Sequence, residues 1–267
     1  FYRNEMSFWS RFPDEKNLKL KETLFIEATD FNSFGREQNI GHIDFLKLDV
    51  EGAELDVLKG ASDYLKNDGA LGVLVEVRFQ RSSNQPIFSE VDSFMESMGF
   101  NLFDVSIYRH SRKTLPGAFL EKDEKGKSVP GSSRKGQVIW ANALYLRDGV
   151  AELQNGVNQS AWNACRVLKL ACLFEIFDLS DCAIELLQQT RDYFKDISID
   201  YLIDLLTPPL KGRNIPYSEY LKKREAGEND EGHFLISKLS QDFRSIISWY
   251  LPASIKHFIV NIREKLK

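Results

Sequence analysis

The sequence predicts an α/β fold in the first half of the chain and an all-helical unit in the second half. Strand-like and helix-like segments alternate in the first half, which is the order of a right-handed α/β crossover fold. Two strand-like segments, 43–50 and 70–79, are apolar on both faces, as is typical of parallel strands covered by helices. Beyond Gly149 only helix-like segments follow. We therefore divide the chain into an α/β domain at 1–149 and a helical domain at 150–267.

The elements of the first half follow from local patterns. We expect a strand at 24–29, a short helix or turn at 30–39, a strand at 43–50, a helix within 51–66, a strand at 70–79, a helix at 88–98, and strands at 100–107 and 137–147. The helix within 51–66 carries leucine and alanine on one face and is expected to end at Gly60. The last two strands are joined by a loop, so we expect them to form an antiparallel pair at one edge of the sheet.

The loop expected at about 108–136 is long for a compact domain. From 112 to 135 it holds seven basic residues against three acidic ones. Loops of this length are either functional or solvated linkers. Two interpretations stay open here: a solvated linker, or a flap that guides an anionic or sugar-bearing substrate.

The second half is expected to contain helices at 158–176, 180–195, 197–206, 217–225, 233–250 and 252–267. The first two are predicted to form an αα-hairpin, and no fixed period indicates a repeat array. The last helix has an apolar stripe beside several basic residues. Packing of this stripe on neighbouring helices is the favoured interpretation, and contact of 252–267 with an anionic membrane surface is the alternative.

Composition places the chain among ordinary globular proteins. Its 267 residues allow one large domain or two smaller ones, and a net charge of -4 with 43% hydrophobic residues gives no indication of a nucleic-acid partner. No apolar stretch is long enough to span a membrane, and no signal peptide is visible. The chain opens with FYRNEMSFWS and not with methionine, so we expect either a fragment of a longer protein or a truncated inactive protein.

The cysteines and histidines form no metal-binding pattern. Cys165, Cys172 and Cys182 contain no CxxC pair, and the four histidines are scattered. An odd number of cysteines argues against a disulfide framework and for a reducing compartment, so we expect a cytoplasmic protein. The three cysteines are interpreted as small buried fillers on helices.

Three carboxylates directly follow the apolar strand at 43–50. They are Asp49, Glu51 and Glu54, and Gly52 lies among them. One interpretation is structural: Asp49 caps the next helix, and the two glutamates complement its positive end. The other is functional, because ligands of open α/β sheets lie beyond the carboxyl ends of the strands. Gly52, which permits close backbone approach where a helix former is expected, favours the second interpretation.

Lys47 and Glu76 interrupt the two apolar strands that the sequence places side by side. A charge among apolar neighbours is costly unless it has a partner. We expect these two charges to pair with each other beside the three carboxylates, with Glu76 supporting Lys47.

The segment IDFLKLDVEGAELDVLKGA (43–61) resembles the signature of the FkbM-type family of S-adenosylmethionine-dependent methyltransferases. The strand GVLVEVRF, the late strand ALYLR and the upstream stretch ETLFIEATDFNSF are also similar to that family in order and spacing. The likeness covers about 20–147, and the helical remainder lies outside it.

This resemblance implies a class I methyltransferase fold with a Rossmann-like sheet. It implies S-adenosylmethionine as the methyl donor and O-methylation of a hydroxyl group on a sugar, glycan or natural product. The chain departs from the family pattern because it contains no G-x-G loop and because 1–42 is too short for three strands with their helices. We therefore expect a partial sheet that lacks its first strands and most of the cofactor pocket.

The resemblance also implies roles for residues of the signature. Asp49, Glu51 and Glu54 are the expected catalytic residues, and Asp49 with Gly52 is expected to contact the cofactor. Asp49 or Glu51 would orient the acceptor hydroxyl group, act as its base, or hold a divalent cation, and the sequence does not rank these roles. His110 is a further candidate base, although a histidine in a surface loop is the simpler interpretation.

Two other functions stay open. Asp49-Val50-Glu51 has the acid-x-acid form with which many glycosyltransferases hold a metal and a nucleotide sugar. A non-catalytic interaction protein is the second alternative, because the glycine-rich loop is absent. The sequence gives no indication of the oligomeric state.

Overall fold

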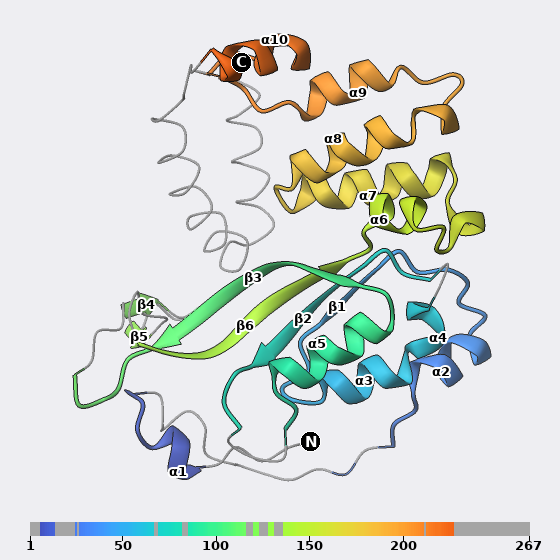
Figure 1. Ribbon diagram of the computed structural model, residues 1–267. Helices are drawn as coiled ribbons and strands as arrows, with labels where there is room; N and C mark the ends of the chain where they lie inside the picture. The colour runs from blue at the N-terminus through green and yellow to red at the C-terminus, as the bar shows by residue number, and fades with distance from the viewer. Residues whose placement is uncertain are drawn as a thin grey trace. The chain divides into compact units, whose positions relative to one another are not determined.

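A computed structural model describes residues 6–13, 25, 27–66, 69–81, 85–115, 120–122, 128–130, 136–210 and 212–226 (Figure 1). The chain divides into two compact units, residues 1–195 and 196–267. The first unit contains the sheet and the first helices of the second half. The domain boundary expected after residue 149 was drawn from the change to helix-like segments in the sequence. The two compact units are defined by contacts, so they do not test this boundary, and it stays a prediction.

Four strands form the main sheet of the first unit. In spatial order they are β1 (Phe45–Leu48), β2 (Gly72–Arg78), β6 (Gln137–Leu146) and β3 (Asn101–His110). β1 and β2 are parallel, and β6 is antiparallel to both of its neighbours (Figure 1). The predicted α/β arrangement, the parallel pair and the antiparallel pair at one edge are confirmed. The mixed sheet is compatible with a Rossmann-like fold.

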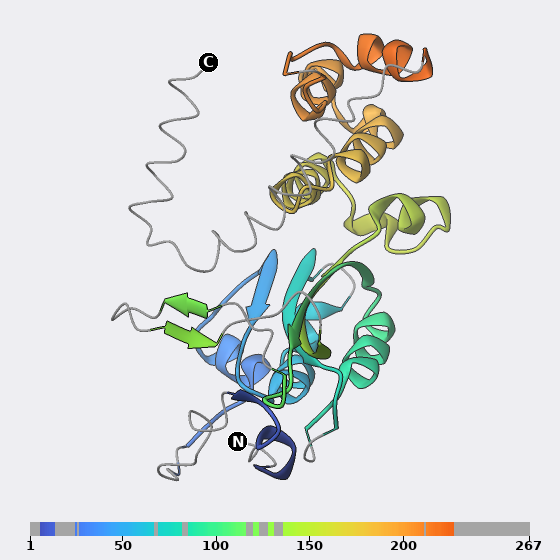
Figure 2. The same cartoon turned by 90° about the vertical axis from the view of Figure 1, so that its left-hand side faces the viewer.

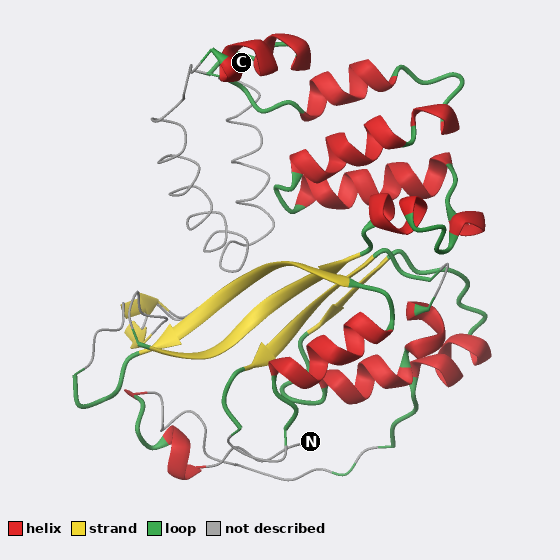
Figure 3. Cartoon of the chain, viewed as in Figure 1, coloured by secondary structure: helices red, strands yellow, loops and turns green. Residues whose placement is uncertain are grey.

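Helices cover one face of this sheet. α2 (Phe31–Glu37), α3 (Glu54–Gly60), α4 (Ser62–Leu65) and α5 (Phe88–Ser97) lie along the same side of the strands (Figure 3). Side chains alternate between the two faces of a strand, so Val73, Val75 and Val77 point into the core on the helix side. Glu76 and Arg78 therefore lie on the opposite face of β2.

The helix expected within 51–66 begins later and is interrupted. It consists of α3 and α4, and α3 ends at Gly60 as predicted. Glu51 and Gly52 have φ angles of 57° and 108°, and a right-handed helix does not accommodate such angles. The carboxylate segment is therefore a turn that precedes the helix.

Two further predictions are corrected by the structure. The strand expected at 24–29 is wrong for its described residues, because Phe25 and 27–29 lie in no strand. The expected loop at 108–136 contains the end of β3 and a separate pair of strands, β4 (Leu120–Lys122) and β5 (Ser128–Pro130). This pair forms its own two-stranded sheet, which lies to one side of the main sheet in Figure 2. Near the start of the chain, α1 (Met6–Trp9) is a single helical turn.

The predicted helices of the second half are present wherever the structure describes the chain. In the first unit the helices predicted at 158–176 and 180–195 are α7 (Ala164–Ile176) and α8 (Ser180–Gln189), which pack together as the expected hairpin. α6 (Gly149–Gln154) is a further helix that was not predicted. The second unit contains α9 (Ile199–Leu206) and α10 (Tyr217–Glu225). The helices predicted at 233–250 and 252–267, and with them the possible membrane contact, lie outside the described residues. No helix in the described ranges has the length and apolar character needed to cross a bilayer.

The cysteines are less buried than expected. Cys165 and Cys172 are exposed on α7, and Cys182 on α8 is half-buried. All three are free thiols, as the odd count predicts. The interpretation as buried fillers is wrong for Cys165 and Cys172, because α7 turns a different face toward the core, with Val167 and Leu170 fully buried.

Arg147 fixes the edge of the sheet at which β1 and β2 begin. Its side chain is only 1% exposed. The guanidinium donates to the carbonyl oxygen of Leu65, to that of Ala70 at 3.4 Å and to that of Gly99 at 3.1 Å. The carboxylate of Glu152 lies 3.5 Å away. One buried cation thus joins the end of α4, the start of β2, the end of α5 and α6.

α7 is anchored at the same edge. Arg166 donates to the carbonyl oxygen of Gly69 at 3.0 Å, and Lys169 forms an ion pair of 2.8 Å with Asp44. The rings of Phe174 and Phe103 pack with centroids 5.3 Å apart. The edge where the parallel strands begin is therefore closed by helices.

Candidate active site

The predicted site residues lie at the opposite edge, beyond the carboxyl ends of β1 and β2. Asp49 follows β1 directly, and Glu51 and Gly52 form the turn that leads into α3. Glu51 has a left-handed backbone, which costs a non-glycine residue roughly 1 kcal/mol. Such strained residues cluster at ligand and active sites. The turn thus has the position and the backbone of a functional loop.

Glu54 holds this turn in shape. Its side chain is nearly buried, at 4% exposure, and Oε1 accepts hydrogen bonds from the backbone N–H of Val50 at 3.1 Å and of Gly52 at 3.0 Å. Two amides that face the inside of the turn are satisfied by one carboxylate oxygen. This geometry gives Glu54 a positioning role within the turn.

Asp49 and Glu51 lie closer to solvent. Asp49 Oδ2 is 3.2 Å from Lys47 Nζ, and the Glu51 side chain is 80% exposed with Oε2 at 3.4 Å from Arg78 Nη2. The explanation of Asp49 as a helix cap is wrong, since the cap of α3 is Ala53 and no side chain supplies a capping hydrogen bond. The Glu51 carboxylate is thus largely exposed to solvent, and the Asp49 carboxylate is about one-third exposed.

A divalent cation at Asp49 and Glu51, one of the roles that the sequence leaves open, is not supported. Within the described part of the chain, no group of three or more histidine, cysteine, aspartate and glutamate side chains is arranged to hold a metal ion. Asp49 and Glu51 each have a basic partner in the structure.

Glu76 joins this group from the neighbouring strand. It lies directly opposite Asn142 of β6, so both side chains lie on the same face of the sheet. Its side chain is 18% exposed and its carboxylate lies 3.8 Å from the guanidinium of Arg78. Burial raises the pKa of Glu76 from its usual 4.5 to about 7, because the nearby carboxylates add to the effect of burial and Arg78 only partly opposes it.

Arg78 connects the two strand ends. The sequence prediction paired Lys47 with Glu76, whereas the structure shows Lys47 with Asp49 and places Arg78 between Glu51 and Glu76. The Arg78 side chain is 11% exposed. The pairing of Arg78 with Glu76 could have been predicted from the sequence, because residues two apart on a strand share a face.

Gln85 is the second residue that the sequence analysis did not identify. It is 3% exposed, and neither its amide nitrogen nor its oxygen has a hydrogen-bond partner in the described structure. Its carboxamide lies against Gly52, so a Cβ atom at position 52 would force the Gln85 side chain to shift. The φ angle of 108° at Gly52 also strains any residue other than glycine. No sequence pattern marks Gln85, which lies between β2 and α5.

His110 is not a surface loop residue. It is the last residue of β3 and is only 7% exposed. The centroid of its ring lies 4.4 Å from the ring centroid of Trp140 and 6.3 Å from that of Phe12. The interpretation as an exposed loop histidine is therefore wrong, and the contacts place His110 among aromatic side chains.

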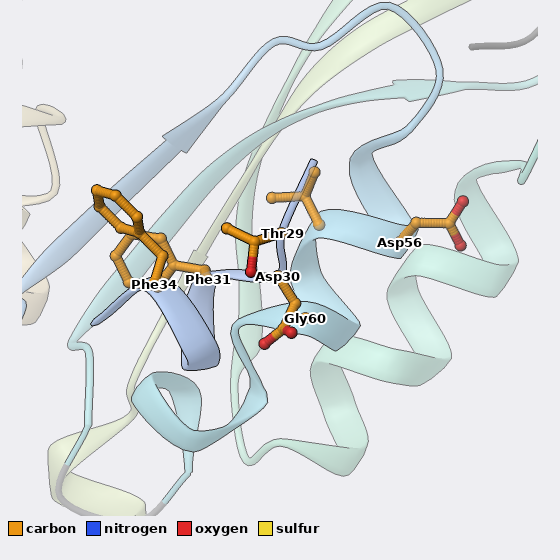
Figure 4. A pocket seen from close by; sticks show the side chains of 7 residues that line it. Thr29, Asp30, Phe31, Phe34, Asp56 and Gly60 are labelled. Carbon is orange, nitrogen blue, oxygen red and sulfur yellow. The ribbon is translucent and has the colours of Figure 1, made fainter. Parts of the chain in front are cut away.

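A separate hollow of about 490 Å³ lies between the start of α2 and α3 (Figure 4). The rings of Phe31 and Phe34 lie together on one side of it, and Asp56 points away from them. Asp30 is occupied as the cap of α2, where it accepts from the N–H of Ser33 at 2.9 Å. None of the carboxylates of the turn lines this hollow.

One family model matches part of the chain. Residues 6–102 match the model of the methyltransferase FkbM domain, and the resemblance drawn from the signature is thereby confirmed. The match includes the turn at 49–54 and β2, and ends within β3. No curated protein and no solved structure matches the chain.

Proposed function

We propose, from the methyltransferase FkbM domain at residues 6–102, that this protein is an S-adenosylmethionine-dependent methyltransferase. The acceptor in this proposal is a hydroxyl group on a sugar, glycan or natural product. The observation that carries the proposal is the family match across the turn at 49–54, which lies where α/β sheets bind ligands. The mixed sheet is compatible with the Rossmann-like fold of class I methyltransferases.

The charges of the site suit a cationic methyl donor. S-adenosylmethionine carries a positive sulfonium and a positive ammonium group. Four acidic side chains face two basic ones at the carboxyl edge of the parallel strands: Asp49, Glu51, Glu54 and Glu76 against Lys47 and Arg78. The excess of negative charge favours a cation at this edge.

Two further features fit a bound ligand on this side. The amide of Gln85 is buried without a partner in the described residues, so both a donor and an acceptor are left over beside Gly52. Asp49, with its side chain about one-third exposed, lies at the same turn. We assign cofactor contact to Asp49 and Gly52 on this basis. The chain has no glycine-rich G-x-G loop, so these residues account for one side of the cofactor only.

The residues have distinct roles in the proposed reaction. Bound S-adenosylmethionine supplies an electrophilic methyl group. Alignment of the acceptor oxygen with that group is the main task of the protein. Asp49 and Glu51 orient the acceptor hydroxyl group, and Glu54 contributes by holding the turn that carries both of them.

Isothermal titration calorimetry of the full chain tests the proposal. We expect S-adenosylmethionine to bind and nucleotide sugars not to bind. Asp49→Asn should weaken binding about tenfold, since it removes one of the negative charges that attract the sulfonium. The matched control Asp63→Asn removes a charge from α4 and should bind like the wild type.

The alternative functions predict different results. Binding of a nucleotide sugar alone would favour a glycosyltransferase. Binding of neither compound would leave the non-catalytic interaction protein. Transfer of a tritiated methyl group to a panel of sugars and oligosaccharides then tests the acceptor class.

A further inference from the structure

Glu76 differs from the other carboxylates of the site in how it is held. Asp49 has a lysine partner at 3.2 Å, and Glu54 accepts two backbone hydrogen bonds. Glu76 lies at a longer 3.8 Å from Arg78, which it shares with Glu51. Close cations and N–H donors stabilise the ionised form of an acid, so Glu76 is the carboxylate that is stabilised least.

The place of Glu76 suits proton transfer. It lies near the carboxyl end of β2, one strand from Asp49, and its side chain is more than four-fifths buried. The amide of Asn142, opposite Glu76, reaches the hydroxyl of Tyr108 at 3.5 Å. The face of the sheet beside Glu76 thus presents polar groups that can hold a hydroxyl-bearing molecule.

We propose that Glu76 accepts the proton of the acceptor hydroxyl group and that Arg78 positions its carboxylate. This inference rests on the proposed methyltransferase function. In the step, the acceptor oxygen forms a bond to the methyl carbon while the carbon–sulfur bond breaks. The electron pair of that bond stays on sulfur, which becomes a neutral thioether. The hydroxyl proton passes to the carboxylate of Glu76, which later releases it to solvent.

The charged surroundings of Glu76 support this assignment. Arg78 on its own strand favours the ionised form, whereas Glu51, Asp49 and Glu54 from the turn disfavour it. Lys47 lies next to Asp49 on β1. Asn142 of β6 lies opposite Glu76, and Ser106 of β3 lies opposite Asn142, and both are uncharged. The hydroxyl of Tyr108 accepts from the amide of Asn142 at 3.5 Å. The resulting pKa of about 7 is suited to a general base at neutral pH.

Proton release on cofactor binding tests the assignment without knowledge of the acceptor. A cationic ligand beside Glu76 lowers the pKa of its carboxyl group, so binding at pH 7 should release up to about half a proton. Calorimetry of the full chain with S-adenosylmethionine in two buffers of different ionisation enthalpy measures this number. The amino group of the ligand also titrates near neutral pH, so the decisive quantity is the difference between wild type and Glu76→Gln.

We expect Glu76→Gln to bind S-adenosylmethionine and to lose that part of the proton release. Glu76→Asp should retain it, and so should the control Glu96→Gln, which removes the same charge from the exposed side of α5. Equal proton release in wild type and Glu76→Gln would overturn the assignment and leave the proposed function intact. If the wild type does not bind S-adenosylmethionine at all, the proposed function fails and the assignment fails with it.

Discussion

The two edges of the main sheet use buried polar groups in opposite ways. At the edge where β1 and β2 begin, Arg147 is 1% exposed and donates to three carbonyl oxygens. At the edge where they end, Gln85 is 3% exposed and its amide has no partner in the described residues. Glu76 lies at this second edge with a raised pKa, next to a turn with two left-handed residues.

The first edge thus contributes mainly to the stability of the sheet, and the second carries the features of a ligand site. Buried polar groups in folded proteins are normally satisfied, and each exception calls for an explanation. Arg147 follows the rule and holds four elements together. Gln85 departs from it, and Glu76, whose pKa is raised, lies beside the same signature turn. Perturbed acids and strained backbones are typical of ligand sites, so the second edge has kept features that lower the stability of the free protein.

The largest effect is expected from breaking the first edge. Arg147→Met removes the donor of three buried carbonyl oxygens and leaves Glu152 without this cation. We expect a loss of about 4 kcal/mol in the free energy of unfolding. Urea denaturation of the full chain measures it.

A surface arginine provides the matched control. Arg36 pairs with Asp63 at 3.0 Å, and both side chains are more than half exposed, at 64% and 57%. Arg36→Met should leave the urea midpoint almost unchanged, because exposed ion pairs contribute little. Similar losses in the two variants would contradict the role given to Arg147.

The second effect concerns the support of the turn. Glu54→Ala leaves the N–H groups of Val50 and Gly52 without an acceptor, and we expect a loss of about 2 to 3 kcal/mol. Glu54→Gln keeps one oxygen at the same place and should lose clearly less. An alanine variant as stable as the glutamine variant would mean that the turn does not depend on these hydrogen bonds.

The third effect is a gain in stability: unlike the two preceding substitutions, replacement of Glu76 should stabilise the folded protein. The pKa of Glu76 in the folded chain, about 7, is above its usual 4.5, so the folded state binds more protons between these values. The contribution of Glu76 to wild-type stability should therefore fall as the pH rises from about 4.5 to 7. Glu76→Gln removes this dependence and should be on the order of 2 kcal/mol more stable than wild type at pH 8. The stability difference between the two proteins, measured by denaturation from pH 5 to 8, should shrink toward pH 5; a constant difference would count against the raised pKa.

The smallest effect comes from the unpartnered amide. Gln85→Leu replaces it with an apolar group of similar size, and we expect a gain of about 1 kcal/mol because no unsatisfied polar atom stays buried. Gln85→Ala removes the amide as well but leaves a cavity, so it should be less stable than Gln85→Leu. Thermal unfolding distinguishes the two. Destabilisation by leucine would show that the amide is satisfied in solution.

The sequence predicted the layout of the sheet well, because a strand that is buried on both faces can be recognised as a continuous run of apolar residues. The apolar runs that became β1 and β2, and the spacing of Asp49, Glu51 and Glu54, placed a site at the correct strand ends. The pattern did not show that Glu51 and Gly52 adopt left-handed backbones, and the helix was therefore predicted to begin too early. Nor did it show Gln85, because only the fold brings that residue over Gly52.

Charge partners were predicted less well than strands. Lys47 and Glu76 are both polar interruptions of apolar strands, and the sequence alone favoured a pair between them. The structure brings Asp49 to Lys47 and Arg78 to Glu76, because residues two apart on a strand share a face. His110 was taken for a loop residue because β3 extends further than its apolar pattern indicates.

The contacts of Arg147 also constrain the order in which the chain becomes native during synthesis. Its hydrogen bonds to Leu65, Ala70 and Gly99 close loops of 82, 77 and 48 residues. Contacts this distant form late, because loop closure must precede them. β1, β2 and α5 leave the ribosome well before β6, yet their shared edge is locked only after Arg147 has emerged. A nascent chain that stops short of β6 would expose the edges of β2 and β3 that β6 covers, and we expect it to depend on chaperones until β6 is inserted.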